Sequence, residues 1–342
     1  MTLTDLKARL KSGNIGGWYV FAGEEEYLKA YYRNEIKKIA VPDEAFAPFN
    51  HTVYEGQDVS IAGIAEAIKA PPMMSDYKLI EWRFADIDKL KAGEISALTE
   101  LFSEKKDYPE TVILITATAD GFDVGTAKRP SKLAKTLSEG FDLVVFEKST
   151  DQQLLAWMKK HFDAEGIEID LQTLSALLFR VGHSMQMLKN EISKLSAYAK
   201  ARGSSRVSTE DVNEVTSSTV ECDAFAISNA IIEKNAEKAF LALADMKQQR
   251  LAPQVVLGQL ARTYGELMSV ALLMEEGKGS SDIETIMKFH PYRLKLYMSA
   301  AKKLGTARIS AALDDLVKTD AASKMGGIAD YKAVEMFITK NI

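Results

Sequence analysis

The residues that come closest in type and spacing to a motif that performs chemistry run from Gly23 to Ala30, with the sequence GEEEYLKA. A phosphate-binding P-loop, GxxxxGK[ST], holds phosphates with backbone amides and a lysine, and holds magnesium with a hydroxyl. Gly23 and Lys29 fall at the first-glycine and lysine positions, whereas Leu28 replaces the second glycine and Ala30 replaces the hydroxyl residue. Glutamates 24–26 would repel a triphosphate because they carry like charge. The segment therefore predicts a nucleotide-binding scaffold that binds no nucleotide.

The acidic residues of a nucleotide hydrolase are also missing. In such enzymes acids near the end of a core strand hold magnesium and polarise water. Here Trp82 and Arg83 end the expected third strand, and Asp86 and Asp88 follow at a spacing that we do not assign to a metal. We therefore predict no intrinsic ATPase activity.

No other set of residues has the spacing of a catalytic or metal site. The histidines at 51, 161, 183 and 290 are far apart in the sequence and form no HxxxH or HExxH pair. Cys222 has no neighbouring histidine, and a lone thiol usually packs as a small hydrophobe. We expect no catalytic residues, no metal and no cofactor.

A corner at Pro72, Met73 and Met74 is the strongest candidate for binding a partner. The two prolines at 71 and 72 block helix continuation and hold the methionines between a helix ending near Lys69 and the next strand. In one interpretation both methionines fold back into the core. In the other they form an exposed apolar wedge that enters a partner's pocket. The residues alone favour neither.

A basic cluster consists of Lys128, Arg129, Lys132 and Lys135. Pro130 suits the first position of a helix, so the cluster is predicted to lie on a loop and on one face of a helix over 130–138. A solvated charged face is the commoner role of such a run, and contact with DNA phosphates is the alternative.

The elements that position these residues change in kind after residue 147. Before it, short apolar runs alternate with helix-period segments, which predicts an α/β domain with a parallel sheet. After it, amphipathic segments predict helices alone. The expected strands are 18–22, 50–54, 77–82, 111–116 and 142–146, and the expected helices between them are 26–39, 60–69, 92–103 and 130–138. Three or four short helices are expected over 151–212, followed by longer ones at 224–233, 236–247, 253–276, 281–287, 291–303, 306–319 and 329–339.

Composition limits the function further. With 342 residues the chain is long enough for two or three domains, and its formal net charge of -5 restricts any contact with nucleic acid to a local basic patch. The single cysteine excludes an intramolecular disulfide. Since no signal-peptide core or long apolar run occurs, we expect a cytoplasmic protein without a membrane partner.

Several segments resemble the delta subunit family of bacterial DNA polymerase III, the clamp-loader member that opens the sliding clamp. They occur in order, nearly from end to end, so together they are more specific than any one of them. The segments are VFAGEEEYL at 20–28, PMMSDYKLI at 72–80, VGHSMQMLKNEISKL at 181–195, VSTEDV at 207–212 and LVKTDAASK at 316–324.

The resemblance implies an AAA+-like architecture. Its parts are a clamp-contacting α/β domain without a functional P-loop at 1–147, a small helical lid at 148–212 and a helical collar for oligomerisation at 213–342. The implied partners are the sliding clamp, the ATPase and delta-prime type clamp-loader subunits, and primer-template DNA. The chain would be a subunit of a DNA-directed DNA polymerase holoenzyme, associated with the replisome and nucleoid.

The resemblance also implies that the clamp is gripped by Pro72, Met73 and Met74, while ATP is bound by partner subunits. Two other functions stay open at this point. An active AAA+ ATPase with a divergent loop would be stabilised by nucleotide. A DNA-binding module centred on Lys128 to Lys135 would show a steep salt dependence of DNA affinity.

Overall fold

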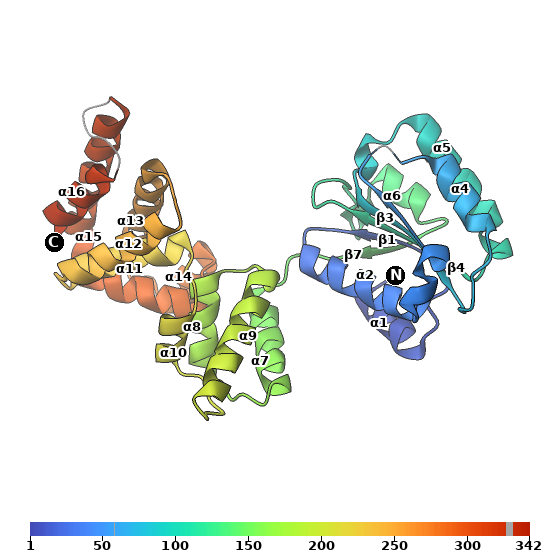
Figure 1. Cartoon of the computed structure of the whole chain (residues 1–342). Coiled ribbons are helices and arrows are strands. Elements are labelled where there is room, and N and C mark those ends of the chain that lie inside the picture. Colours follow the sequence, from blue (N-terminus) through green and yellow to red (C-terminus); the bar gives the residue numbers. More distant parts are fainter. Residues whose placement is uncertain (58, 326–330) are drawn as a thin grey trace. The chain divides into compact units, whose positions relative to one another are not determined.

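The computed structural model describes residues 1–57, 59–325 and 331–342. The chain divides into two compact units, Met1–Ser149 and Thr150–Ile342 (Figure 1). This division lies two residues beyond the predicted end of the α/β domain at 147. The further boundary predicted at 212, between a lid and a collar, stays a prediction.

The first unit is built on a five-stranded parallel sheet with the strand order β2-β3-β4-β1-β7. All five strands predicted from the sequence are present, and the third extends three residues past its expected end. The central strands β1 and β4 are buried along their whole length, as expected when helices cover both faces of a parallel sheet. The strands are β1 (Trp18–Ala22), β2 (His51–Glu55), β3 (Lys78–Ala85), β4 (Thr111–Ala117) and β7 (Asp142–Val145).

Helices cover the two faces of this sheet and close two separate apolar cores (Figure 1). Trp18 and Val20 of β1 pack in one core with residues of α4 and α6, whereas Tyr19 and Phe21 pack in the other with residues of α1 and α2. This alternation follows from the two-residue period of a strand. The helices are α1 (Leu3–Ser12), α2 (Glu26–Ala40), α3 (Ala47–Asn50), α4 (Ile61–Lys69), α5 (Ala92–Glu100) and α6 (Lys132–Leu137), with 3-10 segments at Glu44–Phe46, Ile87–Lys89 and Leu101–Asp107.

Two helices of this unit, α1 and α3, were not predicted, although Thr2 caps α1 with a complete capping box. The helix expected over 130–138 begins at Lys132, because the side chain of Ser131 caps the Ala134 amide. Pro130 lies instead in a two-stranded hairpin of β5 (Gly125–Thr126) and β6 (Arg129–Pro130).

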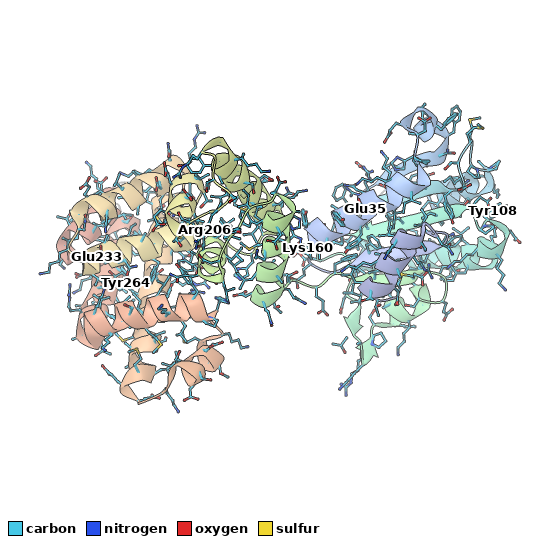
Figure 2. The ribbon with its side chains drawn as sticks, turned by 90° about the horizontal axis from the view of Figure 1, so that it is seen from below. Glu35, Tyr108, Lys160, Arg206, Glu233 and Tyr264 are labelled. Carbon is cyan, nitrogen blue, oxygen red and sulfur yellow. The ribbon has the colours of Figure 1, made fainter. Side chains whose placement is uncertain are left out.

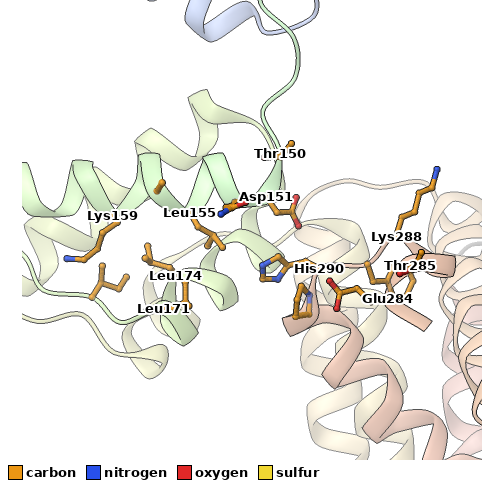
Figure 3. Close-up of a pocket in the computed structure, with 15 residues that line it drawn as sticks. Thr150, Asp151, Leu155, Lys159, Leu171, Leu174, Glu284, Thr285, Lys288 and His290 are labelled. Atoms are coloured by element: carbon orange, nitrogen blue, oxygen red, sulfur yellow. The ribbon is translucent and has the colours of Figure 1, made fainter. Parts of the chain in front are cut away.

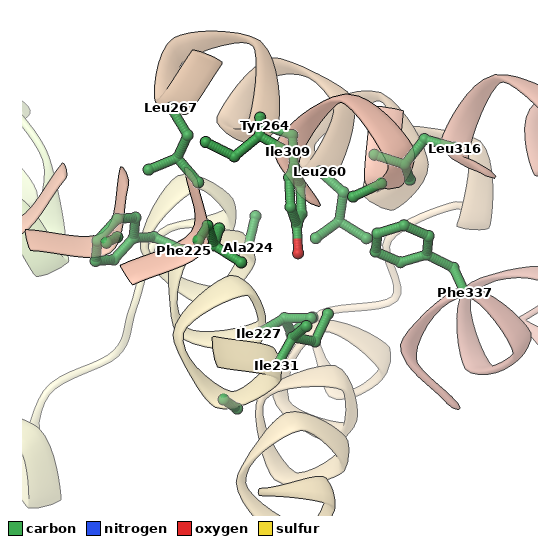
Figure 4. Close-up of a cluster of buried hydrophobic side chains, with 14 of the residues drawn as sticks. Ala224, Phe225, Ile227, Ile231, Leu260, Tyr264, Leu267, Ile309, Leu316 and Phe337 are labelled. Atoms are coloured by element: carbon green, nitrogen blue, oxygen red, sulfur yellow. The ribbon is translucent and has the colours of Figure 1, made fainter. Parts of the chain in front are cut away.

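The second unit is helical, and its described residues contain no strand beyond an isolated bridge between Glu168 and Arg206. Its largest apolar core gathers residues of α11, α12, α13, α15 and α16, including Leu260, Tyr264 and Phe337 (Figure 4). The helices are α7 (Asp151–Ala164), α8 (Leu171–Val181), α9 (Met185–Ala201), α10 (Thr209–Val215), α11 (Val220–Ile232), α12 (Ala236–Gln248), α13 (Pro253–Glu275), α14 (Ser280–Met287), α15 (Pro291–Lys324) and α16 (Lys332–Asn341).

Helix α15 joins the two helices predicted at 291–303 and 306–319. Gly305 lies between them with φ 72° and ψ 157°, which is not a helical conformation, so the break occurs where the sequence placed it. The start of the helix predicted at 329–339 lies outside the described residues, and α16 begins at Lys332.

Charged side chains face solvent on each unit. Glu35 on α2 pairs with Lys38, and Arg206, which precedes α10, pairs with Asp170 (Figure 2). Within the described parts of the chain, no helix combines the length and the apolar character needed to span a bilayer.

Candidate functional site

The loop at Gly23 is shaped by close packing against the end of β7. Gly23 has φ 98°, and a Cβ atom built on it would lie 2.4 Å from the carbonyl oxygen of Phe146. The amide of Glu25 donates to the same oxygen over 3.0 Å, and the amide of Phe146 donates to Ala22 over 2.8 Å. Glycine is therefore required here by the approach of two backbones, as well as by its positive φ.

The lysine of the degenerate loop points into the protein. The side chain of Lys29 is fully buried, and its Nζ donates to the carbonyl oxygen of Ala117 at the end of β4 and to Glu26 Oε1, each over 2.7 Å. Leu28 packs against the apolar core beside α2, and Ala30 is half-buried. The ammonium group thus supplies a hydrogen-bond donor to a backbone carbonyl at the end of β4, within its own domain.

A pocket of about 590 Å³ lies beside this loop, and carboxylates dominate its charge. Lys148 lines it and forms a 2.7 Å ion pair with Glu24, and this hydrogen bond lowers the pKa of that carboxyl. A cavity with this excess of negative charge is unfavourable for a triphosphate. Its acidic lining residues are Glu24, Asp88, Asp120, Asp123 and Glu147.

Trp82 and Arg83, which replace the expected magnesium acids, have structural partners. The indole of Trp82 is buried and donates to the Gly56 carbonyl oxygen over 2.8 Å. Arg83 pairs with Glu81 over 2.5 Å and with Glu55 over 3.6 Å. Among the described residues, no group of three or more histidine, cysteine, aspartate or glutamate side chains is arranged to hold a metal ion.

The corner at Pro72 presents both methionines to solvent. Met73 is 44% exposed and Met74 is 81% exposed, while Pro72 is half-buried. The interpretation in which both methionines fold back into the core is therefore wrong. Large apolar side chains exposed next to one another are a common feature of protein-binding surfaces.

The backbone of this corner is held by buried polar groups. The side chain of Asn50 forms two hydrogen bonds with Met73: its Nδ2 donates to the Met73 carbonyl, and its Oδ1 accepts from the Met73 amide, each over 2.7 Å. Asn50 itself is only 1% exposed. The hydroxyl of Ser75 donates to the Ala40 carbonyl over 2.9 Å. The corner is thus anchored on either side of Met74.

Lys78 fastens the helix that leads into the corner. Its buried ammonium donates to the carbonyls of Ala67, Ile68 and Ala70, which satisfies the carboxyl end of α4. Burial lowers the pKa of Lys78.

Sequence reasoning did not identify Asn50, Ser75 or Lys78 as functional residues. A weak signal existed, because Asn50 is a polar residue directly before the strand β2 and Lys78 is a charged residue that begins the largely buried strand β3. Their partners lie 23 and 8 to 11 residues away, so the contacts depend on the fold.

The basic cluster is exposed, but it does not form a single helical face. Lys128 and Arg129 lie in the β5–β6 hairpin, and only Lys132 and Lys135 lie on α6. The amide of Arg129 donates to Thr126 Oγ1 over 3.1 Å, which closes the hairpin. Within the described parts of the chain, none of the four cations has an ion-pair partner.

The second unit contains a larger pocket, of about 1030 Å³, lined by residues of α7, α8, α14 and the start of α15 (Figure 3). Leu155, Leu171 and Leu174 line it together with the charged residues Lys159 and Lys288. The sequence did not predict this pocket.

A smaller cavity of about 180 Å³ brings together two histidines that are distant in the sequence, His183 and His290. His183 Nε2 lies 2.8 Å from Asp151 Oδ1, and this hydrogen bond raises the pKa of His183 and lowers that of Asp151. The pair links the start of α7 to the segment between α8 and α9.

Two family models and two relatives point to the same family. The model of the family described as DNA polymerase III, delta subunit, matches residues 19–147, and the model described as DNA polymerase III delta subunit, C-terminal domain, matches residues 221–341. DNA polymerase III subunit delta of Bacillus subtilis (strain 168) is 21% identical over 341 residues, which cover 98% of this chain and 95% of that protein. The probable DNA polymerase III subunit delta of Aquifex aeolicus (strain VF5) is 22% identical over 334 residues, covering 95% and 91%.

A solved structure shares the fold over almost the whole length. The Bacillus subtilis DNA clamp loader delta protein superposes with a TM-score of 0.58 at 19% identity, covering 99% of this chain and 98% of that one. The predicted order of an α/β domain with a parallel sheet followed by helices is confirmed. Since models of both its N-terminal and C-terminal parts match, this chain belongs to the DNA polymerase III delta subunit family.

Proposed function

We propose that this chain binds the sliding clamp through Pro72, Met73 and Met74 and helps to open it for loading on primed DNA. The observation that carries the proposal is the pair of exposed methionines on a backbone that buried groups hold in place. Membership of the delta subunit family supplies the class of partner.

The chemistry of the corner suits an apolar pocket on a partner protein. Methionine is unbranched and polarizable, so it fills irregular pockets well. A few buried apolar side chains commonly supply most of the free energy of an interface. If the corner binds the open form of a clamp interface more tightly than the closed form, binding shifts the population toward the open form without any chemical step.

We further propose that this chain binds no nucleotide and that partner subunits supply the ATPase activity. The buried Lys29 ammonium, the missing hydroxyl at Ala30 and the carboxylates beside Gly23 support this proposal. An active ATPase with a divergent loop is correspondingly disfavoured.

The proposed roles of the helical regions and of DNA rest on membership of the delta subunit family. The helices of 213–342 would form the collar that joins this chain to the ATPase and delta-prime type subunits, and 148–212 would form the lid. The assembled complex would act on primer-template DNA in the cytoplasm, at the replisome.

Contact with DNA phosphates is a second candidate function, and the exposed cations Lys128, Arg129, Lys132 and Lys135 favour it. Replacing all four with alanine should weaken DNA binding and flatten its salt dependence. Equal salt dependence before and after the replacement would exclude these residues.

Measuring clamp affinity by surface plasmon resonance tests the main proposal. We expect Met73→Ser with Met74→Ser to weaken binding by at least about 30-fold, the effect of losing an interface hot spot. The matched control is Met187→Ser with Met325→Ser, because these two methionines are 46% and 81% exposed and lie in the helical unit. Unchanged affinity in the Met73 and Met74 variant would refute the proposed site.

A further inference from the structure

We propose that Asn50 is a positioning residue that holds Met73 and Met74 in the conformation that binds the partner. This inference rests on the proposed function of the corner. Asn50 is the last residue of α3, directly before β2, so a regular element carries it. It is almost fully buried and is not itself available to a partner.

The two hydrogen bonds between Asn50 and Met73 fix one peptide segment from both sides. A side-chain amide offers a donor and an acceptor from one planar group, and here they meet the carbonyl and the amide of the same residue, each over 2.7 Å. Both torsions of Met73 are thereby restrained. Aspartate, which has the same shape, retains an acceptor for the amide but offers no donor to the carbonyl when ionised.

Met74 follows in a backbone conformation that needs such restraint. Its φ of 54° is in the left-handed region, which bulky non-glycine residues rarely adopt. Residues persist there when the surrounding structure determines them. The anchors are Asn50 on Met73, before Met74, and the Ser75 hydroxyl on the Ala40 carbonyl, after it. The exposed side chain of Met74 makes no comparable anchor among the described residues.

The expected consequence is a loss of affinity without loss of any contacting side chain. If a protein adopts its binding conformation only a fraction of the time, its apparent dissociation constant rises by the inverse of that fraction. A corner that is correctly formed about a tenth of the time would bind about tenfold more weakly. Preorganisation of this kind commonly governs affinity at constant interface area.

Asn50→Asp in the full chain is the decisive variant. We expect about tenfold weaker binding to the sliding clamp encoded in the same genome. The matched control is Asn14→Asp, which makes the same chemical change in an exposed residue of the same unit, after α1. Ser75→Ala tests the second anchor without placing a charge in the interior, and it should weaken binding in the same direction.

A measurement on the unaltered chain tests the inference independently of folding defects in a variant. In protein labelled with ¹⁵N-methionine, the amide hydrogen of Met73 should exchange at least about tenfold more slowly than that of Met74, after correction for intrinsic rates. In Asn50→Asp this protection should fall at Met73, while amides of the central strand β4 keep theirs. A purely structural role would lower protection across the sheet.

The outcomes separate this inference from the proposed function. Weak binding in both Asn50→Asp and the Met73 and Met74 double variant supports both. Weak binding in the double variant with unchanged binding in Asn50→Asp and Ser75→Ala overturns the positioning role and leaves the proposed site intact. Unchanged binding in the double variant overturns both. Rapid exchange of the Met73 amide in the unaltered chain overturns the positioning role directly.

Discussion

At the scale of single residues, Lys29 occupies the lysine position of a P-loop but stabilises the fold instead of binding phosphate. Its buried ammonium group donates a hydrogen bond to the Ala117 carbonyl at the end of β4 and forms an ion pair with Glu26 in the first turn of α2. A buried donor of this kind is costly to remove, because its acceptor is left without a partner. Lys29 is therefore a stability residue in this chain.

We predict that Lys29→Ala lowers the free energy of unfolding by about 1–3 kcal/mol, through the unpaired Ala117 carbonyl and the space left by the lysine stem. Urea denaturation measures this change. The exposed Lys135→Ala should stay within about 0.5 kcal/mol of the unaltered chain.

Excess magnesium and ATP provide the matching nucleotide test. They should leave the melting temperature of the unaltered chain and of Lys29→Ala unchanged, since only a ligand that binds the folded state raises it. A rise in the unaltered chain that Lys29→Ala abolishes would contradict our account of the loop.

At the scale of elements, Gly305 determines the path of α15. Its φ of 72° and ψ of 157° interrupt the helix, and no atom lies within 4 Å of the place where a Cβ would stand. Any penalty for a side chain there must come from the backbone conformation. Such combinations of φ and ψ are essentially restricted to glycine.

We predict that Gly305→Ala destabilises the helical unit by about 1–3 kcal/mol, as measured by chemical denaturation. Gly258→Ala in α13 is the matched control, because this exposed glycine is helical and has equally open surroundings. That control should stabilise the chain by about 0.5–1 kcal/mol. A stabilising Gly305→Ala would show that α15 can continue as an uninterrupted helix.

At the scale of the whole molecule, the first unit, Met1–Ser149, contains all the residues that the proposed clamp contact requires. Its two apolar cores consist of residues from 1 to 149 alone, and the anchors of the corner, Asn50, Ser75 and Lys78, belong to the same unit. A unit of this length is within the usual size of an independently folding domain.

We predict that residues 1–149, produced alone, unfold cooperatively and bind the clamp within about threefold of the full chain, since no anchor of the corner is lost. Circular dichroism during urea denaturation tests folding, and surface plasmon resonance tests binding. A folded fragment with strongly reduced affinity would place essential contacts in the helical unit.

Local patterns in the sequence were sufficient for most of the elements. Strands such as 18–22 and 111–116 are apolar runs bounded by turn residues, and the break at Gly305 follows from a residue type that disfavours helices. The start of α6 was misplaced because two local signals compete there, Pro130 and the Ser131 cap. Element boundaries depend on such close competition.

The sequence by itself determined the five strands of the main sheet, most of the helices, the missing P-loop residues and the place of the Pro72 corner. The tertiary structure decided that Met73 and Met74 face solvent, that Asn50 grips Met73, and that Lys29 turns inward to a carbonyl 88 residues away. The physical reason is the range of the interactions. Backbone propensity and periodicity act between neighbours in the chain, whereas burial and side-chain hydrogen bonding depend on which distant segments the fold brings together.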